Sequence, residues 1–383
     1  MSGQRTIQQA ALANTQISVA QPHPVQLTHQ YVTRVVNGVL AADWDSWLAQ
    51  SPGGGHILQS YAFGEFKRTV RWKPVRLVLE RGGVVMGLGQ FLVYKTPLVP
   101  GTLMYCPKGP WLPWDDDEAL RVFFAGVQQV ARRQRAHTVK IEPEVREQQA
   151  AVKAQLLALG FRKGRYDLQF KSTMLVNLTP AEDVLLGRMK DKTRYNIRLA
   201  GRKGVTVVEE NSLAAREAFF RLFQVTAARD GFVLRPWTYY QAMWQQMYDA
   251  GRAHLFFAMH EGQRLAGILI YTFGTKYWYM VGASGNEKRN LMPTYLLQWE
   301  VMRWAKRNGL TYYDMVAIPN PDRLNEQDPM YGLYRFKVGF GGEPAEFLGC
   351  LDLPTRPLLA TAWYGFEPLY YRLYMRLKHN NYY

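Results

Sequence analysis

Two separated stretches of the chain combine apolar runs with a short charged turn that contains glycine. Residues 76–91 read RLVLERGGVVMGLGQF, and residues 255–271 read LFFAMHEGQRLAGILIY. Two apolar runs joined by such a turn are typical of an antiparallel β-hairpin. The pattern therefore predicts one β-hairpin in each half of the chain.

Each predicted hairpin is followed by the same further elements: an apolar strand, an amphipathic helix that ends in basic residues, and one more strand. These elements cover 92–105, 119–135 and 137–143 in the first half, and 276–283, 295–308 and 310–316 in the second half. The repeated order indicates an internal duplication. We expect an α/β (α+β) fold of two tandem domains, whose mixed, largely antiparallel sheets carry helices on their faces.

The duplication divides the chain into predicted domains. The first domain covers 31–175 and is completed by the C-terminal segment 348–383, and the second covers 176–347. Residues 1–30 are rich in Gln and Ala and carry one charge, Arg5, so we predict a mobile tail rather than a signal peptide. No apolar run is long enough for a transmembrane helix. These features predict a cytoplasmic protein, which we expect to be a monomer.

The charge balance indicates a polyanionic partner. The formal net charge is +16 and the isoelectric point is near 9.7, which suits nucleic acid, a phosphorylated metabolite or an anionic membrane surface. Basic residues recur every four positions in the segment RMKDKTRYNIRLAGRKGVTV at 188–207, and on a helix they would form one stripe: Lys190, Arg194, Arg198 and Arg202. Because like charges at this spacing repel, the stripe predicts an anionic ligand.

The sequence predicts neither a metal site nor a cofactor. Cys106 and Cys350 are isolated, and the seven histidines show no ligand spacing. The duplicated unit resembles the acetyltransferase (GNAT) fold, in which a Gly-rich turn before a helix cradles the pyrophosphate of coenzyme A. The corresponding segments here are NEKRNLMPTYLL at 286–297, which has no glycine, and the acidic PWLPWDDDEAL at 110–120. An acyl-CoA site is therefore disfavoured in both halves.

Six further motifs occur along the chain in a defined order. They are HILQSYAFGEFKRTVRW at 56–72, YCPKGPWLPWDD at 105–116, RMKDKTRYNIRLAGRKGV at 188–205, RDGFVLRPWTYY at 229–240, YWYMVGAS at 277–284 and LYRFKVGFGG at 333–342. Together they resemble the Fem family (FemA, FemB and FemX), the non-ribosomal peptidyltransferases of bacterial cell-wall synthesis. Residues 212–240 hold one ordinary helix instead of the long coiled-coil arm of FemA-type members, so the chain resembles the short FemX-like form.

This resemblance implies a reaction between two large anions. An aminoacyl-tRNA supplies an activated ester, and the side-chain amine of a diamino acid in a peptidoglycan precursor attacks it, which builds the interpeptide bridge. The precursor of such enzymes is UDP-MurNAc-pentapeptide or lipid II. Positioning and electrostatics can supply most of the acceleration for an activated ester. The absence of a Ser/His/Asp or Cys/His set from the motifs therefore does not argue against catalysis.

The resemblance also implies roles for individual residues. Those that match precursor-binding residues of the family are Lys67, Arg235, Tyr239, Tyr279 and Tyr105. Lys337 and Phe336 match the Phe-Lys pair of the active site, where the lysine hydrogen-bonds the tRNA 3′ end and stabilises the oxyanion. The basic stripe becomes a candidate contact for the tRNA backbone, and the acids at 115–117 are candidate helpers in proton transfer.

Alternatives remain open from the sequence. A GNAT-like N-acyltransferase with another acyl donor, or a non-catalytic RNA- or membrane-binding module, would show the same domain pattern. Within the family match the functional roles of Lys67 and Lys337 are favoured, and the alternative for each is a solvated lysine, which for Lys337 would lie in a predicted strand–turn segment. The alternative for Tyr279 is a core residue. The aromatic C-terminal segment predicts packing onto the first domain, and the alternative is peripheral docking at the inner face of the membrane.

Overall fold

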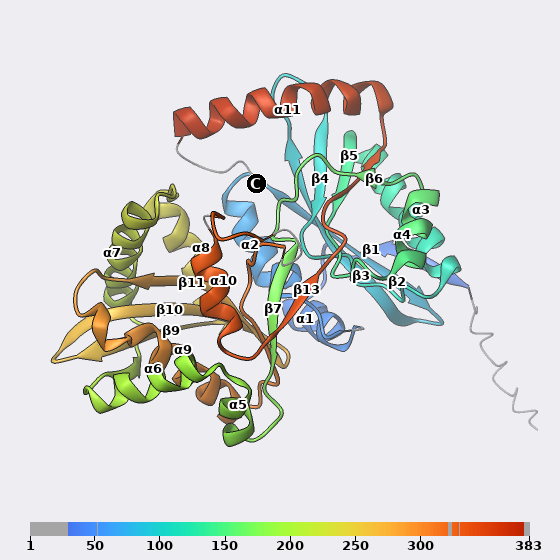
Figure 1. The fold of residues 1–383 in the computed structure, drawn as a ribbon. Coiled ribbons are helices and arrows are strands. Elements are labelled where there is room, and N and C mark those ends of the chain that lie inside the picture. The colour runs from blue at the N-terminus through green and yellow to red at the C-terminus, as the bar shows by residue number, and fades with distance from the viewer. Residues whose placement is uncertain (1–29, 52, 321–323, 329, 379–383) are drawn as a thin grey trace, which may run out of the picture.

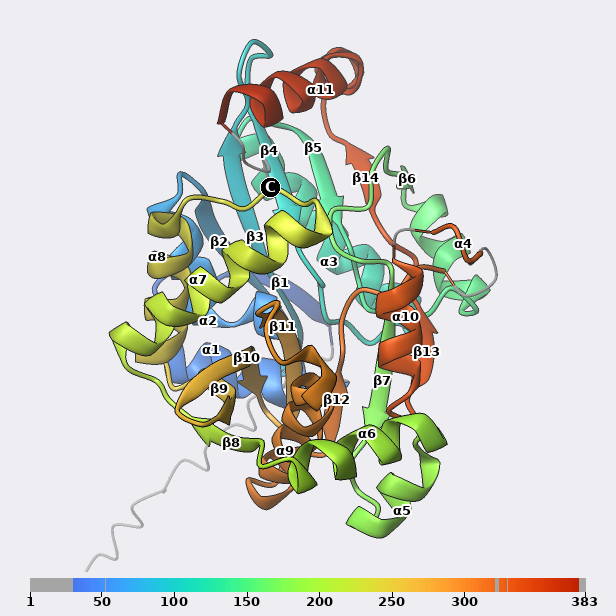
Figure 2. The same cartoon turned by 60° about the vertical axis from the view of Figure 1, so that its left-hand side comes forward.

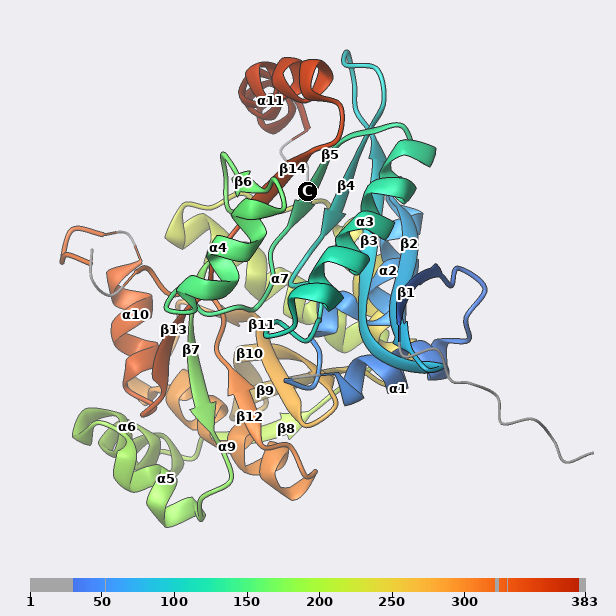
Figure 3. The same cartoon turned by 90° about the vertical axis from the view of Figure 1, so that its right-hand side faces the viewer.

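The computed structural model describes residues 30–378 apart from 52, 321–323 and 329, and it describes no side chains at 371 and 373–378. The predicted mobile tail therefore lies outside the described residues, except for Gln30. Two twisted sheets lie next to each other with helices around them (Figures 1, 2 and 3). The α/β fold of two sheet-containing units agrees with the prediction.

The first sheet contains seven strands within the described part of the chain. In spatial order they are β1 (Tyr31–Val35), β2 (Lys73–Arg81), β3 (Val84–Lys95), β4 (Thr102–Cys106), β5 (Ala136–Ile141), β14 (Leu351–Pro354) and β6 (Arg162–Lys163). β2 and β3 form the first predicted hairpin, and β4 pairs antiparallel with β3. β5 then pairs parallel with β4, because the helix α3 (Asp117–Arg133) carries the chain back across the sheet.

The second sheet repeats this arrangement. In spatial order its strands are β13 (Glu343–Glu346), β7 (Ser172–Asn177), β12 (Tyr312–Asp314), β11 (Lys276–Ser284), β10 (Gln263–Phe273), β9 (Ala253–His260) and β8 (Thr206–Glu209). β9 and β10 form the second predicted hairpin, β11 pairs antiparallel with β10, and β12 pairs parallel with β11. The helix α9 (Pro293–Arg307) makes this second crossover. The shared order of strand, strand, strand, helix and strand supports the predicted duplication.

The two sheets exchange one strand each. β7 follows β6 in sequence, but it lies in the second sheet between β12 and β13. β14 follows β13 in sequence, but it lies in the first sheet between β5 and β6. The predicted boundary at 175/176 falls inside β7, so the chain passes to the second sheet between Lys163 and Ser172. Because both exchanged strands are paired on two sides, the two units cannot separate without breaking sheet hydrogen bonds.

Nine further helices surround the sheets in the described part of the chain. They are α1 (Ala41–Gln50), α2 (Tyr61–Thr69), α4 (Ala150–Ala158), α5 (Glu182–Arg188), α6 (Asp191–Arg202), α7 (Leu213–Asp230), α8 (Trp237–Asp249), α10 (Tyr331–Val338) and α11 (Pro357–Lys378). α2 packs against α8, so helices from the two halves of the chain meet between the sheets.

Three buried apolar clusters follow from this layering. One lies between the first sheet and α3, and one lies between the second sheet and α9. The third, here called the interdomain core, contains side chains from both sheets and from α1, α2, α7 and α8. Adjacent residues of β11 show the division: Tyr277 points into the α9 side and Trp278 into the interdomain core, because side chains alternate along a strand.

The basic segment forms two helices rather than one. α5 ends at Arg188 and α6 begins at Asp191, so Lys190 stands at the N-terminal cap of α6. Ile197 and Ala200 are buried against the second sheet. Gly204, with φ 82°, follows the end of α6 and leads into β8, as a left-handed glycine commonly does after a helix.

The prediction of a strand and turn around Lys337 is wrong. These residues form α10, which ends at Val338 and is capped by Gly339. Phe336 and Phe340 lie one helical turn apart with their ring centroids at 5.1 Å. Apolar residues at every second position from Phe336 to Phe340 also fit a strand, so the short segment was ambiguous by pattern alone.

The C-terminal helix α11 packs onto the first domain, as predicted. Trp363 is buried against Val99 and lies 5.8 Å from the ring of His137. Glu367 on α11 and Asp352 on β14 flank the buried Lys140 ammonium on β5, at 3.8 and 3.1 Å. Burial lowers the pKa of Lys140, but the Asp352 and Glu367 carboxylates outweigh this effect and raise it above its usual value. No described helix is both long enough and apolar enough to cross a membrane.

We expect Lys140→Met to lower the free energy of unfolding by about 3–5 kcal/mol, because it leaves two buried carboxylates without their cation. Lys153→Met is the matched control: Lys153 is half-exposed in an ion pair with Glu147, and its loss should cost less than about 1 kcal/mol. Urea denaturation of both variants measures the difference. Equal losses in the two variants would contradict the structural importance of the Lys140 cluster.

Candidate active site

Lys67 on α2 lies in an aromatic cage. Its Nζ atom is 5.5, 5.9 and 5.8 Å from the ring centroids of Phe63, Phe66 and Trp72, and only 6% of the residue is exposed. Burial, with a further contribution from the nearby Arg235 guanidinium, lowers the pKa of Lys67 from 10.5 to about 7. Within the described part of the chain, no carboxylate forms an ion pair with Lys67. The solvated lysine that was one alternative is therefore excluded.

Arg235 and Tyr239 bring the second half of the chain to this cage. The Arg235 guanidinium lies 4.2 Å above the Tyr239 ring. Tyr239 on α8 in turn meets Phe66 edge-on, with the ring centroids 5.2 Å apart. Residues from both domains, Lys67 from one and Arg235 with Tyr239 from the other, thus form one cluster of cations and aromatic rings.

Tyr105 on β4 borders the same cage on the side of Trp72. Its ring centroid is 6.4 Å from that of Trp72. The Tyr105 hydroxyl donates a hydrogen bond to the buried Glu142 carboxylate and accepts one from Gln169. Burial, then the Glu142 charge, raises the pKa of Tyr105 well above its usual value, so the phenol stays protonated. These bonds fix Tyr105 as part of the wall of the cage.

Lys337 on α10 is the second buried lysine. Its ammonium donates hydrogen bonds to the carbonyl oxygens of Val316 and Ala317, at 2.7 and 2.8 Å. Both carbonyls belong to residues with positive φ, 54° and 32°, a conformation that is costly for residues other than glycine. Burial lowers the pKa of Lys337 to about 7, and the nearby Asp314 acts in the opposite direction. Lys337 therefore holds a strained turn at the end of β12.

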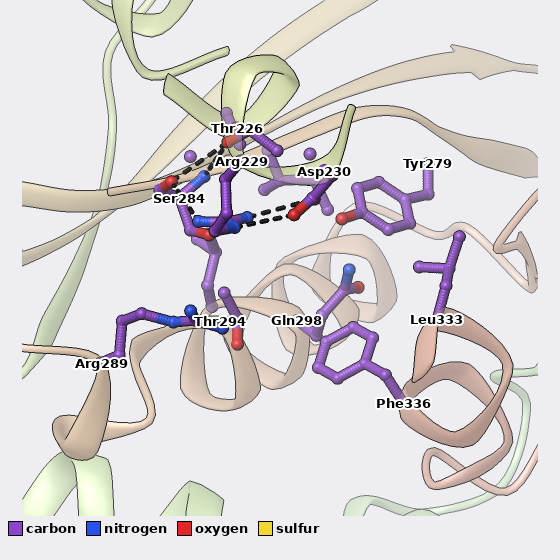
Figure 4. Close-up of a pocket in the computed structure, with 15 residues that line it drawn as sticks. Thr226, Arg229, Asp230, Tyr279, Ser284, Arg289, Thr294, Gln298, Leu333 and Phe336 are labelled. Carbon is purple, nitrogen blue, oxygen red and sulfur yellow. Dashed lines mark hydrogen bonds and ion pairs between the residues drawn. The ribbon is translucent and has the colours of Figure 1, made fainter. Parts of the chain in front are cut away.

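Tyr279 on β11 lies beside Lys337 rather than beside Lys67. The Lys337 Nζ atom is 5.5 Å from the Tyr279 ring centroid. Tyr279 and Phe336 both line a pocket of about 300 Å³ between β11, α7, α9 and α10, here called the Tyr279 pocket (Figure 4). The structure thus groups Tyr279 with Phe336 and Lys337, whereas Lys67, Arg235, Tyr239 and Tyr105 form the other cluster.

A buried amide orients the Tyr279 hydroxyl. Tyr313 donates its hydroxyl hydrogen to Oε1 of Gln298, which leaves the Gln298 NH₂ group to donate to the Tyr279 oxygen. Burial raises the pKa of Tyr279 to about 12 despite this hydrogen bond, so Tyr279 is a neutral O–H donor. Gly282 makes the position possible, because a Cβ atom there would lie 1.7 Å from the Tyr279 hydroxyl.

The far end of the Tyr279 pocket is cationic. Arg289 and Thr294 stand there at the N-terminus of α9, and Arg229 is held by Asp230 and by the Ser284 carbonyl (Figure 4). This is the position of the glycine-free turn identified in the sequence. Among the described residues, no group of three or more His, Cys, Asp or Glu side chains could hold a metal ion.

A second pocket, here called the basic pocket, opens on the other side of Phe336. It measures about 330 Å³ and is lined by Lys190, Lys192, Thr193, Tyr295, Gly332, Arg335 and Phe336. Lys192 and Arg335 were missed from the sequence, although both lie within motifs already recognised there. Their contribution depends on α6 and α10 meeting in space, which the sequence does not reveal.

The predicted basic stripe is only partly an open cationic surface. Lys190, Arg198 and Arg202 are exposed. Arg194 is half-buried, and its guanidinium bonds the Asp191 carboxylate and the Met189 carbonyl. Lys190 belongs to the basic pocket, whereas Arg198 and Arg202 lie farther along α6. The anionic ligand predicted from the stripe therefore has its best-formed site at the N-terminal end of α6.

Two acetyltransferase-like units share one core, and a pocket opens beside the second central strand pair, which is the architecture of a tandem acyltransferase fold. The acetyltransferase (GNAT) domain model matches residues 187–337, and the FemAB family model matches residues 39–261. The chain therefore belongs to the FemAB family, and it is an aminoacyltransferase.

Curated relatives and solved structures agree with this assignment. Two lipid II:glycine glycyltransferases of Staphylococcus aureus, one of them from strain MRSA252, are 27% and 26% identical, over 80% of this chain and 90% of each relative. The crystal structure of FemX has a TM-score of 0.80 at 24% identity, over 85% of this chain and 98% of that chain. The C-terminal domain of a putative lysylphosphatidylglycerol synthetase from Agrobacterium fabrum has a TM-score of 0.51 at 12% identity, over 88% and 98%. The two structures show a shared fold.

Lys67 and Lys337 should both titrate near pH 7 instead of near 10.5. Arg235→Gln should raise the pKa of Lys67, because it removes a nearby cation, and should leave Lys337 unchanged. The unfolded chain keeps both protons up to about pH 10.5, so these lysines should make the free energy of unfolding increase between about pH 7 and pH 10.5. NMR titration of isotopically labelled lysines measures the pKa of Lys67 and that of Lys337. Titration of either residue near its usual pKa would contradict the burial described here.

Proposed function

We propose that this aminoacyltransferase moves an amino acid from an aminoacyl-tRNA to the side-chain amine of a diamino acid in a peptidoglycan precursor, which builds the interpeptide bridge. The observation that carries the proposal is the approach of two cations, Lys67 and Arg235, from opposite domains. An ammonium without a carboxylate partner, buried beside a guanidinium, is costly unless an anion binds between them. A diphosphate would supply negative charge to both cations.

The aromatic surroundings suit the rest of the precursor. Phe66, Trp72 and Tyr239 present ring faces and edges beside the two cations. Arginine and lysine bind phosphate oxygens through strong, charge-assisted hydrogen bonds, and aromatic rings pack against sugar and peptide groups. The relatives' names specify lipid II as their acceptor, and we propose a lipid-linked precursor here as well. Lys67 and Arg235 would hold its diphosphate.

The basic pocket supports an RNA donor. Lys190, Lys192 and Arg335 offer three cations to a phosphate backbone, and Tyr295 and Phe336, whose ring centroids are 5.1 Å apart, offer a surface on which a terminal base can stack. Phe336 also lines the Tyr279 pocket. A tRNA 3′ end in the basic pocket would therefore deliver its ester to the side of Phe336 on which Tyr279 lies.

The chemistry is an aminolysis. The acceptor amine attacks the ester carbonyl, the tetrahedral intermediate carries an oxyanion, and its collapse forms the amide and releases the ribose hydroxyl of the tRNA. A protonated lysine has three N–H donors, and Lys337 uses two of them on Val316 and Ala317. We assign its third donor, together with the Tyr279 O–H group, to the oxyanion. The leaving ribose oxygen takes up the proton that the amine loses.

Direct transfer assays test the proposal. Purified protein is incubated with lipid II or UDP-MurNAc-pentapeptide and a panel of charged tRNAs. The panel begins with glycyl-tRNA, because the relatives are named glycyltransferases. Amide formation from at least one charged tRNA is expected. Acyl transfer from acyl-CoA with none from any charged tRNA would support a GNAT-like acyltransferase with another donor instead.

Two variants should separate chemistry from acceptor binding. Lys337→Met should lower kcat about 10²–10³-fold, because one oxyanion donor is lost, with little change in precursor affinity. Arg235→Ala should weaken precursor binding about tenfold or more, because charge-assisted hydrogen bonds are lost. Lys203→Met, on an exposed position after α6, is the control. Full turnover by a folded Lys337→Met variant would rule out the assigned role.

A further inference from the structure

The outward face of α11 is uncharged over most of its described length. Its inward positions hold Trp363, Phe366, Glu367 and Tyr370 against the first domain. The exposed residues follow one helical stripe and are Leu358, Thr361, Ala362, Gly365, Leu369 and Arg372. A helix on the surface of a soluble protein normally presents charged residues to water. This stripe carries no charge before Arg372.

The tip of the β3–β4 connection lies beside α11. Val99 packs on Trp363, and the three views place this connection and α11 at the same end of the molecule (Figures 1, 2 and 3). The neighbouring Leu98 is 83% exposed and has a positive φ of 63°. Leu358 at the start of α11 is 87% exposed. These are the two most exposed large apolar side chains of the described residues.

The exposed charged residues of the two segments that form this surface are all basic. Arg356, Arg372 and Lys95 are exposed at its margins. Residues 92–103 contain no acid, and residues 353–372 contain only Glu367, which is buried beside Lys140. Pro368 has no N–H group to donate to the Tyr364 carbonyl, and the Arg165 guanidinium donates to this carbonyl instead, at 2.6 Å. We therefore assign Arg165 to the helix backbone and not to the lipid contacts. Exposed apolar side chains together with the basic residues of these two segments match a surface that is both apolar and anionic.

We propose that α11 and the β3–β4 tip form a docking surface for an anionic lipid bilayer. Leu98, Leu358 and Leu369 would enter the interfacial layer, and Arg356, Arg372 and Lys95 would meet lipid phosphates. A second copy of the chain fits less well, because two such faces would bring basic residues together with no exposed acid to pair them. The inference goes beyond the proposed function, since it requires no transfer reaction, and it places the enzyme where a lipid-linked acceptor is found.

Vesicle sedimentation tests the inference. The full chain is mixed with vesicles of phosphatidylglycerol and phosphatidylcholine, or of phosphatidylcholine alone, without precursor or tRNA. We expect binding to the anionic vesicles that weakens with salt and falls at least tenfold in Leu98→Asp/Leu358→Asp. The matched control is Leu40→Asp/Val84→Asp, two exposed apolar residues near α1 and the β2–β3 turn, away from α11. The control should bind like the wild type.

A second readout does not depend on the fold of the aspartate variant. Both native cysteines are buried, so Leu358→Cys can be labelled with a polarity-sensitive dye. A blue shift with anionic vesicles is expected there, and none for the same label at Leu40→Cys.

Three results would overturn the inference: a wild type that stays unbound, an aspartate variant that binds like the wild type, or leucine-dependent self-association in analytical ultracentrifugation. Vesicle binding without any transfer would instead leave the docking surface standing and remove the proposed function. Transfer to soluble UDP-MurNAc-pentapeptide without vesicle binding would support the proposed function and remove the docking surface.

Discussion

The exchange of β7 and β14 between the two sheets is the constraint on which the rest of the structure depends. Each strand follows one domain in sequence and is paired on both sides within the other domain's sheet. The interdomain core then fills the space between the sheets with side chains from both. A site assembled from two domains needs fixed geometry, because displacements of about 1 Å can cost catalysis heavily. Here the fixed geometry comes from paired strands as well as from apolar contact.

Two buried lysines, Lys67 and Lys337, are electrostatically unfavourable within this rigid fold. Lys67 is surrounded by aromatic rings and faces Arg235, and Lys337 is enclosed by the strained turn at Val316 and Ala317. Burial lowers the pKa of each to about 7, although the partners differ. The fold tolerates both because strand pairing and core packing over-determine the surrounding backbone. In our account the free-energy cost of burying these two ammonium groups is offset when the precursor's phosphates bind near Lys67 and the oxyanion forms near Lys337.

Much of the fold could be predicted from the sequence because its signals are local. The hairpins β2–β3 and β9–β10 and the helices α3 and α9 follow from apolar periodicity and turn residues. The exchange of β7 and β14 could not be predicted, since strand pairing between distant segments leaves no local pattern. The strand prediction around Lys337 failed for another reason: the five-residue pattern from Phe336 to Phe340, with apolar residues at i, i+2 and i+4, fits both a strand and a helix.

The candidate site was predicted as a set of residues, but not as two clusters. The motif match placed Tyr279 with the precursor, whereas β11 positions it beside Lys337 and Phe336. Lys192 and Arg335 became visible only when α6 and α10 met around the basic pocket. Gln298 resembled any polar residue within an amphipathic helix until its bond to Tyr313 was seen. Pairings of this kind depend on tertiary structure, which spacing along the chain does not encode.

In our account the tRNA 3′ end lies at Phe336, in the basic pocket, and Lys67 and Arg235 hold the diphosphate. Periodate oxidation of the terminal ribose gives a dialdehyde that forms a Schiff base with a nearby lysine, and borohydride makes the bond permanent. Peptide mapping of the cross-linked protein should then find the label on Lys190, Lys192 or Lys337. A label concentrated on lysines of the first domain, such as Lys153 or Lys163, would contradict the account.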